Sequence, residues 1–417
     1  MLRVENNKKK IRRKKSNFIS YFLFLTSYFL LLTSHLLANT PYQNSIDTTS
    51  IKVYKVAIFA PLYLDSVFAN NKLRNDRSIP KFIMPAVEFV QGVQIAFDSL
   101  FLNNDRVEAF IYDTKSFTEP LIQLIQNKKL DSIDLIIGSV KEPDFKQLAD
   151  FSLSKNIPFI SATFPNDGGV TGNPFLVIIN STLKIHCEGI YNYILQNYGT
   201  DKIFLFKKPG AQEDKIAAYF KTLNEQEGKP LLNIQTVTFD STFSSYAFKR
   251  KLDSNRNSIV IGASLDEDFA KGLASVCYAF KKKYPITLIG MPNWDGINFF
   301  DKEDAYKDFP IRFTTPFFNA RTNSLSNILT AEYNNRYKIK PTDNAFKGFE
   351  TAYYFTKLLV THPHDFMANL NDSSLKVFND FNFKPISFNK QSTVPNYFEN
   401  KHLYVLRIMN GVVSREW

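Results

Sequence analysis

The chain has 417 residues, of which 44% are hydrophobic, a formal net charge of +11 and only two cysteines. This length exceeds one ordinary hydrophobic core and indicates two domains of roughly 120–200 residues each. Residues 1–40 carry eight Lys or Arg and one Glu, so the remaining chain has a net charge of only about +4. The basic run is therefore a topology signal, and we expect no nucleic-acid partner.

The first 40 residues predict export. Residues 8–10 and 12–15 are basic, and residues 18–38 follow without a formal charge. This span could also cross a bilayer as a helix. Two outcomes stay open: a signal peptide cleaved after Ala38, which we favour, or an uncleaved anchor with a cytoplasmic N-terminus. Either outcome places the rest of the chain in the periplasm or at the outer face of the cytoplasmic membrane, with no other contact to the membrane.

Residues 53–180 predict a first lobe in which short apolar strands alternate with amphipathic helices. The expected strands are residues 55–61, 107–114, 134–139, 157–163 and 174–180. The expected helices are residues 85–103, 119–127 and 143–155. This alternation is typical of buried parallel strands in βαβ units.

Residues 181–312 repeat the alternation and predict a second lobe. A helix over residues 182–198 opens it. The expected strands are residues 202–208, 234–239, 258–264 and 286–292, and the expected helices are residues 213–224, 246–252 and 266–282. A further apolar strand at residues 311–318 follows. The sequence thus predicts an α/β fold of two Rossmann-like lobes with mostly parallel sheets.

The rest of the chain predicts how the lobes are joined. Helices are expected over residues 324–337 and 345–360, and about residues 315–360 should return to the first lobe. Residues 361–417 are expected as a C-terminal extension that ends in a hairpin near the hinge, because Asn410 and Gly411 separate two apolar runs. No low-complexity linker follows residue 50, which favours short crossings and a hinged cleft.

Short hydroxyl residues at two strand ends are the first candidates for a binding site. Ser139 ends one expected strand, and Ser161 and Thr163 end the next. Ligands of open α/β sheets bind beyond the carboxyl ends of the strands, so these hydroxyls and nearby N–H groups could hold a small polar ligand. The alternative is that Ser and Thr simply terminate the strands.

The sequence gives little support to catalysis or to a cofactor. It contains no G-x-S-x-G, Walker, H-E-x-x-H or C-x-x-C motif, and no G-x-G-x-x-G follows the first strand. No metal-ligand cluster is present. Cys187 and Cys277 are interpreted as two buried free thiols, although a disulfide stays open in an exported chain. We therefore expect neither an enzyme nor a cofactor.

Several segments, in this order, resemble a known family. They are VAIFAPL (56–62), FVQGVQIAFDSL (89–100), YDT (112–114), IIGS (136–139), IPFISAT (157–163), IGMPNW (289–294) and the block over residues 333–355. Together they resemble the type I periplasmic binding proteins of the branched-chain amino acid receptor group. They resemble more closely a divergent branch of substrate-binding-like proteins of the Bacteroidetes cell envelope. The resemblance covers about residues 53–417.

The resemblance implies an exported solute-binding protein or receptor. It would close two lobes around a small polar ligand, amino-acid-like or another small anion, and an inner-membrane ABC transporter could be its partner. In such receptors, the loops after the third and fourth strands hold the ligand's carboxylate and ammonium. The corresponding loops here contain Ser139 and the run Ser161, Ala162 and Thr163, so the resemblance implies that these residues lie in the site. On the second lobe, Trp294 would be a stacking wall and Asp295 an ammonium partner.

The second lobe also departs from the family pattern. An aromatic residue is expected after its first strand, but residues 207–210 read Lys-Lys-Pro-Gly. Trp294 could instead pack between lobe and hinge, and Asp295 could be a solvated loop carboxylate. The departure keeps a second hypothesis open: a scaffold or regulator of cell-envelope machinery that uses the same fold to bind an envelope protein.

Overall fold

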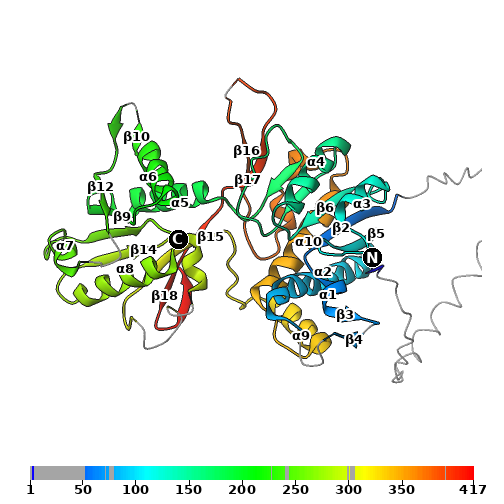
Figure 1. Cartoon of the computed structure of the whole chain (residues 1–417), viewed down its shortest axis with the longest axis horizontal. Helices are drawn as coiled ribbons and strands as arrows, with labels where there is room; N and C mark the ends of the chain where they lie inside the picture. Colours follow the sequence, from blue (N-terminus) through cyan, green and yellow to red (C-terminus); the bar gives the residue numbers. More distant parts are fainter. Residues whose placement is uncertain are drawn as a thin grey trace, which may run out of the picture.

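The computed structural model describes residues 2–3, 52–70, 72–74, 79–226, 228–239, 244–297, 300, 306–389 and 391–417. The expected signal peptide or anchor therefore lies outside the described residues, apart from Leu2–Arg3. Among the described helices, none combines the length and the apolar character needed to cross a bilayer. Two lobes lie side by side, each built on one sheet with helices on both faces (Figure 1). The predicted α/β fold class is confirmed.

The sheet of lobe 1 is parallel except at its two edges. In spatial order its strands are β1 (Leu2–Arg3), β5 (Val107–Asp113), β2 (Tyr54–Ala60), β6 (Leu135–Gly138), β7 (Phe159–Ser161), β8 (Leu176–Ile178), β17 (Tyr397–Asn400) and β16 (Phe383–Ile386). Only β1 and β16 run antiparallel to their neighbours. The central strands are buried on both faces, which explains their continuous apolar runs.

Two layers of helices cover this sheet. On one face lie α2 (Met84–Leu102), α9 (Ser324–Tyr337) and α10 (Asp343–Thr361), which pack with Ile58, Ile137 and other alternate strand residues. On the other face lie α3 (Leu121–Gln126) and α4 (Asp144–Lys155), which pack with Phe59 and Phe159. A short segment after β2 adds α1 (Leu64–Val67), β3 (Phe68–Ala69), β4 (Lys72–Leu73) and η1 (Lys81–Ile83).

The sheet of lobe 2 has the same plan. In spatial order its strands are β12 (Ile234–Thr238), β9 (Lys202–Lys207), β13 (Ser258–Gly262), β14 (Ile286–Ile289), β15 (Ile311–Thr315), β18 (Tyr404–Met409) and β19 (Val412–Arg415). The first five are parallel, and β18 and β19 form an antiparallel hairpin around Asn410 and Gly411. The flanking helices are α5 (Leu183–Tyr198), α6 (Ala211–Asn224), α7 (Ser245–Lys249) and α8 (Glu267–Phe280).

Both lobes place their first strand between their second and third, which is a doubly wound order with a switch point beside the first strand. In lobe 1 the switch point lies between β2 and β6, and in lobe 2 between β9 and β13. The chain leaves lobe 1 at the carboxyl end of β8 and leaves lobe 2 at the carboxyl end of β15. Because β8 is parallel to β7 and β15 is parallel to β14, the carboxyl edges of the two sheets face each other across the hinge.

The hinge consists of three crossings of the chain, at residues 179–182, 316–323 and 401–403. Polar groups tie the first crossing to the end of β17, directly before the third: the Ser181 hydroxyl donates to the Asn400 carbonyl oxygen (2.7 Å), and the Thr182 N–H donates to Glu399 (2.6 Å). Within residues 361–417, β16 and β17 join the first sheet and β18 and β19 join the second. Both cysteines are free and buried in the core of lobe 2.

Candidate functional site

On lobe 1, two of the predicted hydroxyls come together at the carboxyl edge of the sheet. The Ser139 and Thr163 hydroxyl oxygens lie 3.1 Å apart, and both residues are half-buried. They meet because β6 and β7 are neighbours, with Gly138 opposite Ser161. The backbone N–H groups nearby are not free to bind a ligand, although the sequence had suggested that they would be. The Ser139 N–H donates to the Phe59 carbonyl oxygen, and the Ala162 N–H donates to the Gly138 carbonyl oxygen. The side chains, rather than the strand-end N–H groups, are what this edge offers to a ligand.

Ser161 and Ala162 do not reach that edge. Ser161 is fully buried, and its hydroxyl has no hydrogen-bond partner within the part of the chain that the structure describes. Ala162 is buried on the opposite face of the sheet, against the helix layer of α2 and α10. The prediction that the whole run faces the cleft is therefore wrong for these two residues. Side chains alternate between the faces of a strand, so at most every second one can share an orientation.

Two carboxylates beside the switch point of lobe 1 hold loops together. Asp113 accepts from the N–H groups of Leu62, Tyr63 and Leu64 at 2.7–3.0 Å, which orders the turn after β2. Asp65 accepts from the Ser116 hydroxyl (2.8 Å) and from backbone N–H groups of the neighbouring loop. These bonds, the one from Ser116 foremost, lower the pKa of Asp65. Both carboxylates are engaged and support the rim of the edge.

On lobe 2, the charged groups at the carboxyl edge pair with each other. Lys208 lies 2.7 Å from Asp266, the N-cap of α8, and Lys207 lies 2.6 Å from Asp214. The hydrogen bond between Lys208 and Asp266 raises the pKa of the lysine and lowers the pKa of the carboxyl group. The Ser264 hydroxyl donates to the buried Glu213 (2.6 Å). The residues that replace the expected aromatic are thus already neutralised.

Trp294 is not a wall of the cleft, contrary to the prediction. It lies in η2 (Pro292–Gly296), and its side chain is fully buried in the core of lobe 2. The indole ring covers Gly262 and Gly290, where an added Cβ would lie 2.6 Å and 2.0 Å from ring atoms. The two glycines therefore make room for the ring at the ends of β13 and β14. It is a packing residue in this structure.

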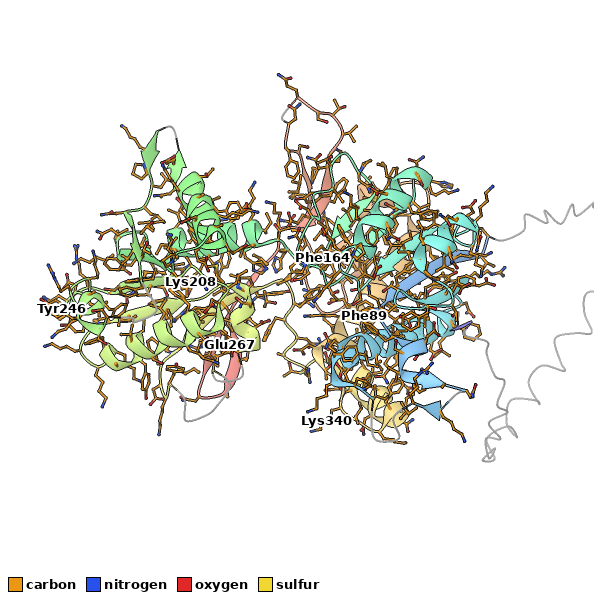
Figure 2. The ribbon with its side chains drawn as sticks, viewed as in Figure 1. Phe89, Phe164, Lys208, Tyr246, Glu267 and Lys340 are labelled. Carbon is orange, nitrogen blue, oxygen red and sulfur yellow. The ribbon has the colours of Figure 1, made fainter. Side chains whose placement is uncertain are left out.

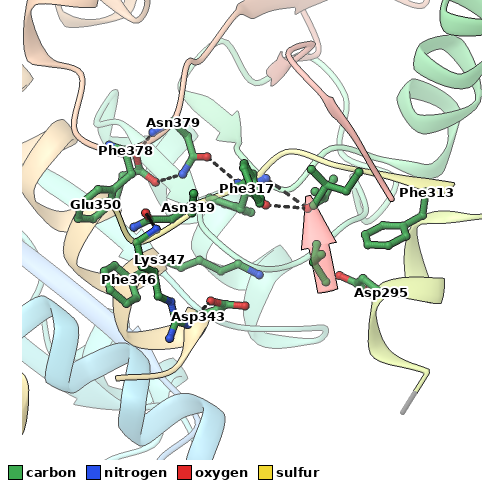
Figure 3. Close-up of a pocket in the computed structure, with 16 residues that line it drawn as sticks. Asp295, Phe313, Phe317, Asn319, Asp343, Phe346, Lys347, Glu350, Phe378 and Asn379 are labelled. Carbon is green, nitrogen blue, oxygen red and sulfur yellow. Dashed lines mark hydrogen bonds and ion pairs between the residues drawn. The ribbon is translucent and has the colours of Figure 1, made fainter. Parts of the chain in front are cut away.

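Asp295 lies apart from the hydroxyl pair, in a pocket beside the hinge. This hinge pocket has a volume of about 310 Å³ and receives residues from both lobes and from the second crossing (Figure 3). Its apolar lining residues are Phe313, Phe317, Phe318, Ala320, Phe346, Phe378, Leu406 and Val413. Neither Ser139 nor Thr163 lines it. The structure thus separates the two sets of residues that the sequence placed in one site.

Comparisons with known proteins rest on structure alone, because no protein-family model and no curated protein matches the sequence. A putative branched-chain amino acid ABC transporter from Rhodospirillum rubrum has 11% identity and a TM-score of 0.62, over 88% of this chain and 100% of that chain. A branched chain amino acid ABC transporter periplasmic ligand-binding protein from Burkholderia xenovorans LB400 has 14% identity and a TM-score of 0.56, over 88% and 95%. The chain has the type I periplasmic binding protein fold.

An ABC transporter substrate-binding protein from Desulfitobacterium hafniense, in complex with Leu, shares this type I fold at 11% identity and a TM-score of 0.52, over 88% and 100%. The predicted cleft would lie between the two facing sheet edges. Figure 2 shows Phe164, which follows Thr163, on the side of lobe 1 toward lobe 2, and Lys208 and Glu267 in lobe 2. Sequence reasoning missed the hinge pocket, since its lining comes from segments far apart in the chain.

Proposed function

We propose that this protein is an exported solute-binding protein that closes its two lobes around a small polar ligand. The observation that carries the proposal is the pair of parallel-sheet edges that face each other across three crossings, with the Ser139–Thr163 hydroxyl pair on one of them. The moving bodies are lobe 1, residues 53–180 with about 315–360, and lobe 2, residues 181–312. Each lobe carries its own strands from residues 361–417.

The ligand we propose is amino-acid-like or another small anion with a carboxylate. Ser139 and Thr163 would donate to that carboxylate, and each neutral hydrogen bond adds about 0.5–1.5 kcal/mol. The named functions of the structural neighbours support an ABC transporter as the partner and the periplasm as the location, since the neighbours are transporter-associated binding proteins. The proposed activity is binding, without catalysis or a cofactor.

A second candidate function is a scaffold or regulator of cell-envelope machinery. The observation that favours it is the carboxyl edge of lobe 2, where Lys207, Lys208 and Glu213 are already paired and Trp294 is in the core. Such an edge offers a solute less than the edge of lobe 1 does. On this alternative the cleft would stay empty of solute and a protein would bind instead.

Release of a bound metabolite distinguishes the two functions. The purified protein is denatured, and its small molecules are identified by mass spectrometry; a stoichiometric carboxylate supports solute binding. The affinity for that carboxylate is then measured in Thr163→Val, which keeps the shape but removes the hydroxyl. We expect roughly tenfold weaker binding, equivalent to about 1.4 kcal/mol.

Ser154→Ala is the matched control, because this exposed hydroxyl on α4 donates only within its own helix. It should bind as the wild type does. Unchanged affinity in both Thr163→Val and Ser139→Ala would refute this site. The absence of any bound or bindable solute would favour the scaffold.

A further inference from the structure

The hinge pocket has the shape of a second ligand site. Its volume of about 310 Å³ is at the lower end of the range of small-molecule sites. A liquid water occupies about 30 Å³, so the pocket has room for a ligand of about ten non-hydrogen atoms. Five phenylalanine rings, from both lobes and from the second crossing, form part of the wall, beside polar and charged residues. The rings fit the apolar body of a ligand, and the polar residues fit a charged or polar group on it.

Most of the charged groups that line the hinge pocket are already engaged. Arg321 lies 2.6 Å from Asp343, with its guanidinium 4.9 Å from the centre of the Phe346 ring. Glu350 is buried and accepts from the N–H groups of Phe378 (2.8 Å) and Asn379 (2.6 Å). Asp343, Glu350 and Arg321 therefore stabilise the wall of the pocket, and most of their hydrogen-bonding groups are already used.

Lys347 is the exception. It extends from α10 toward the lobe-2 side of the pocket (Figure 3), with its ammonium 4.8 Å from the centre of the Phe317 ring. Within the described residues it forms no ion pair. A cation on an apolar wall attracts an anion more strongly than one in open water, since the surroundings screen it less. The pocket therefore has a charge that an organic anion would complement.

Asn319 adds an unused donor to the same pocket. Its Oδ1 accepts from the Arg321 N–H (2.8 Å) and the Ser326 hydroxyl (3.0 Å), which determines the orientation of the amide. Its Nδ2 is buried and has no hydrogen-bond partner in the described part of the chain. A buried donor without an acceptor is costly, and an acceptor bound in the pocket would remove that cost.

We propose that the hinge pocket binds a small monocarboxylate with an apolar body, whose carboxylate contacts Lys347 and Asn319 while its body packs among the phenylalanine rings. Asp295 lines the opposite wall of the pocket. Neither Ser139 nor Thr163 lines the pocket, so the proposed contacts differ from those of the proposed function. Its walls belong to both lobes, so the ligand would also influence the angle between them.

Calorimetric titration of the full-length protein tests this proposal. The probes are phenylacetate and 4-methylpentanoate, used up to about 10 mM, and phenylacetamide is the neutral analogue of equal size. We expect at least one carboxylate to bind, at least tenfold more tightly than the amide. Lys347→Met keeps the aliphatic stem but removes the charge, and it should weaken carboxylate binding at least tenfold.

Asn319→Asp is the second test variant, because it keeps the acceptor for Arg321 and Ser326 and replaces only the Nδ2 donor. It should also weaken binding at least tenfold, and it decides the question if Lys347→Met does not fold. Lys340→Met, which removes an exposed lysine of the same lobe (Figure 2), is the control and should bind as the wild type. Thr163→Val is measured beside it, because it reports any binding of the carboxylate at the hydroxyl pair.

Four results would overturn the proposal. They are no binding of either carboxylate, equal binding of the amide, wild-type affinity in the folded test variants, and an equal loss in Lys340→Met. A loss in Thr163→Val would assign the carboxylate to the cleft, which would refute the hinge site and leave the proposed function standing.

Discussion

At the scale of single residues, Glu350 is the group whose ionisation should affect stability most clearly. Burial raises its pKa above the ordinary value of 4.5, although the donors of Phe378 and Asn379 act in the opposite direction. Between 4.5 and the raised pKa the folded protein holds a proton that the unfolded chain has released. The contribution of Glu350 to stability is therefore present below pH 4.5 and decreases as the pH rises through the raised value.

Glu350→Gln removes this titration but keeps the size of the side chain. The new amide N–H₂ would face the Asn379 side-chain donor, which now lies 2.5 Å from Glu350, so we expect a loss of about 1–3 kcal/mol. Urea unfolding from about pH 4 to 8 measures the free energy of unfolding of both proteins. The contributions of the other carboxylates are the same in both and cancel in the difference. The advantage of the wild type should shrink as the pH rises. A constant difference across the range would show that Glu350 does not titrate differently on folding.

At the scale of elements, lobe 1 depends on the close crossing of α2 and α10. A Cβ added at Gly92 would lie 1.9 Å from the Ala345 carbonyl oxygen, and one at Gly348 would lie 2.0 Å from that of Phe89. Both obstacles are backbone atoms, so the helices would have to move apart. We expect Gly92→Ala to destabilise the protein by about 1–3 kcal/mol through overpacking, measured as a lower midpoint of thermal unfolding.

Gly296→Ala is the control for that crossing. No atom lies within 4 Å of its added Cβ, and the residue is exposed. Its unfolding midpoint should correspond to a change within about 0.5 kcal/mol. Equal stability of Gly92→Ala and the wild type would mean that the two helices can separate freely.

The same scale shows what the sequence could predict. The central strands of both lobes are buried on both faces, so their apolar runs identified them and the fold class followed. β16 and β17 were missed because β16 reads Phe-Lys-Pro-Ile, with exposed residues and a proline, as suits an edge strand. Which sheet each of the strands β16 to β19 joins depends on pairing between distant residues, such as Phe398 with Val177. A local sequence pattern contains no information on such pairing.

The candidate site was predictable only in part, for a similar reason. Ser139 and Thr163 meet because neighbouring parallel strands end at one edge, and alternation with short helices indicates such neighbours. Trp294 was misplaced because an aromatic residue after a strand can turn toward the cleft or toward the sheet. The signal that decides it is the pair Gly262 and Gly290, which leave space for the ring. Their closeness to Trp294 is visible only in the folded chain.

At the scale of the whole molecule, the proposed function requires the lobes to approach each other when a ligand binds. Lys146 on α4 and Asp268 on α8 are exposed, and both helices begin at the facing edges. Spin labels on the double variant Lys146→Cys, Asp268→Cys would report the distance between the lobes. We expect the distance to shorten when the metabolite released from the protein is added back.

The native cysteines should not interfere with these labels. Both are buried, and burial raises the pKa of the Cys187 thiol to about 12 and that of Cys277 well above its usual value, so little thiolate forms. Adding Thr163→Val should raise the ligand concentration for half-closure roughly tenfold. A distance that stays the same at saturating ligand would show that the lobes are fixed.

The three crossings also govern the order in which the protein can be made. Domains commonly fold one after another as a chain is synthesised. Here β8 gains its second neighbour only when β17 has been synthesised, and β15 gains its second neighbour only when β18 has been synthesised. Both sheets keep an unpaired strand edge until about residue 400 has been added, and such edges invite pairing with other chains. A premature stop shortly before residue 397 would therefore leave two aggregation-prone halves rather than one finished lobe and one defective one.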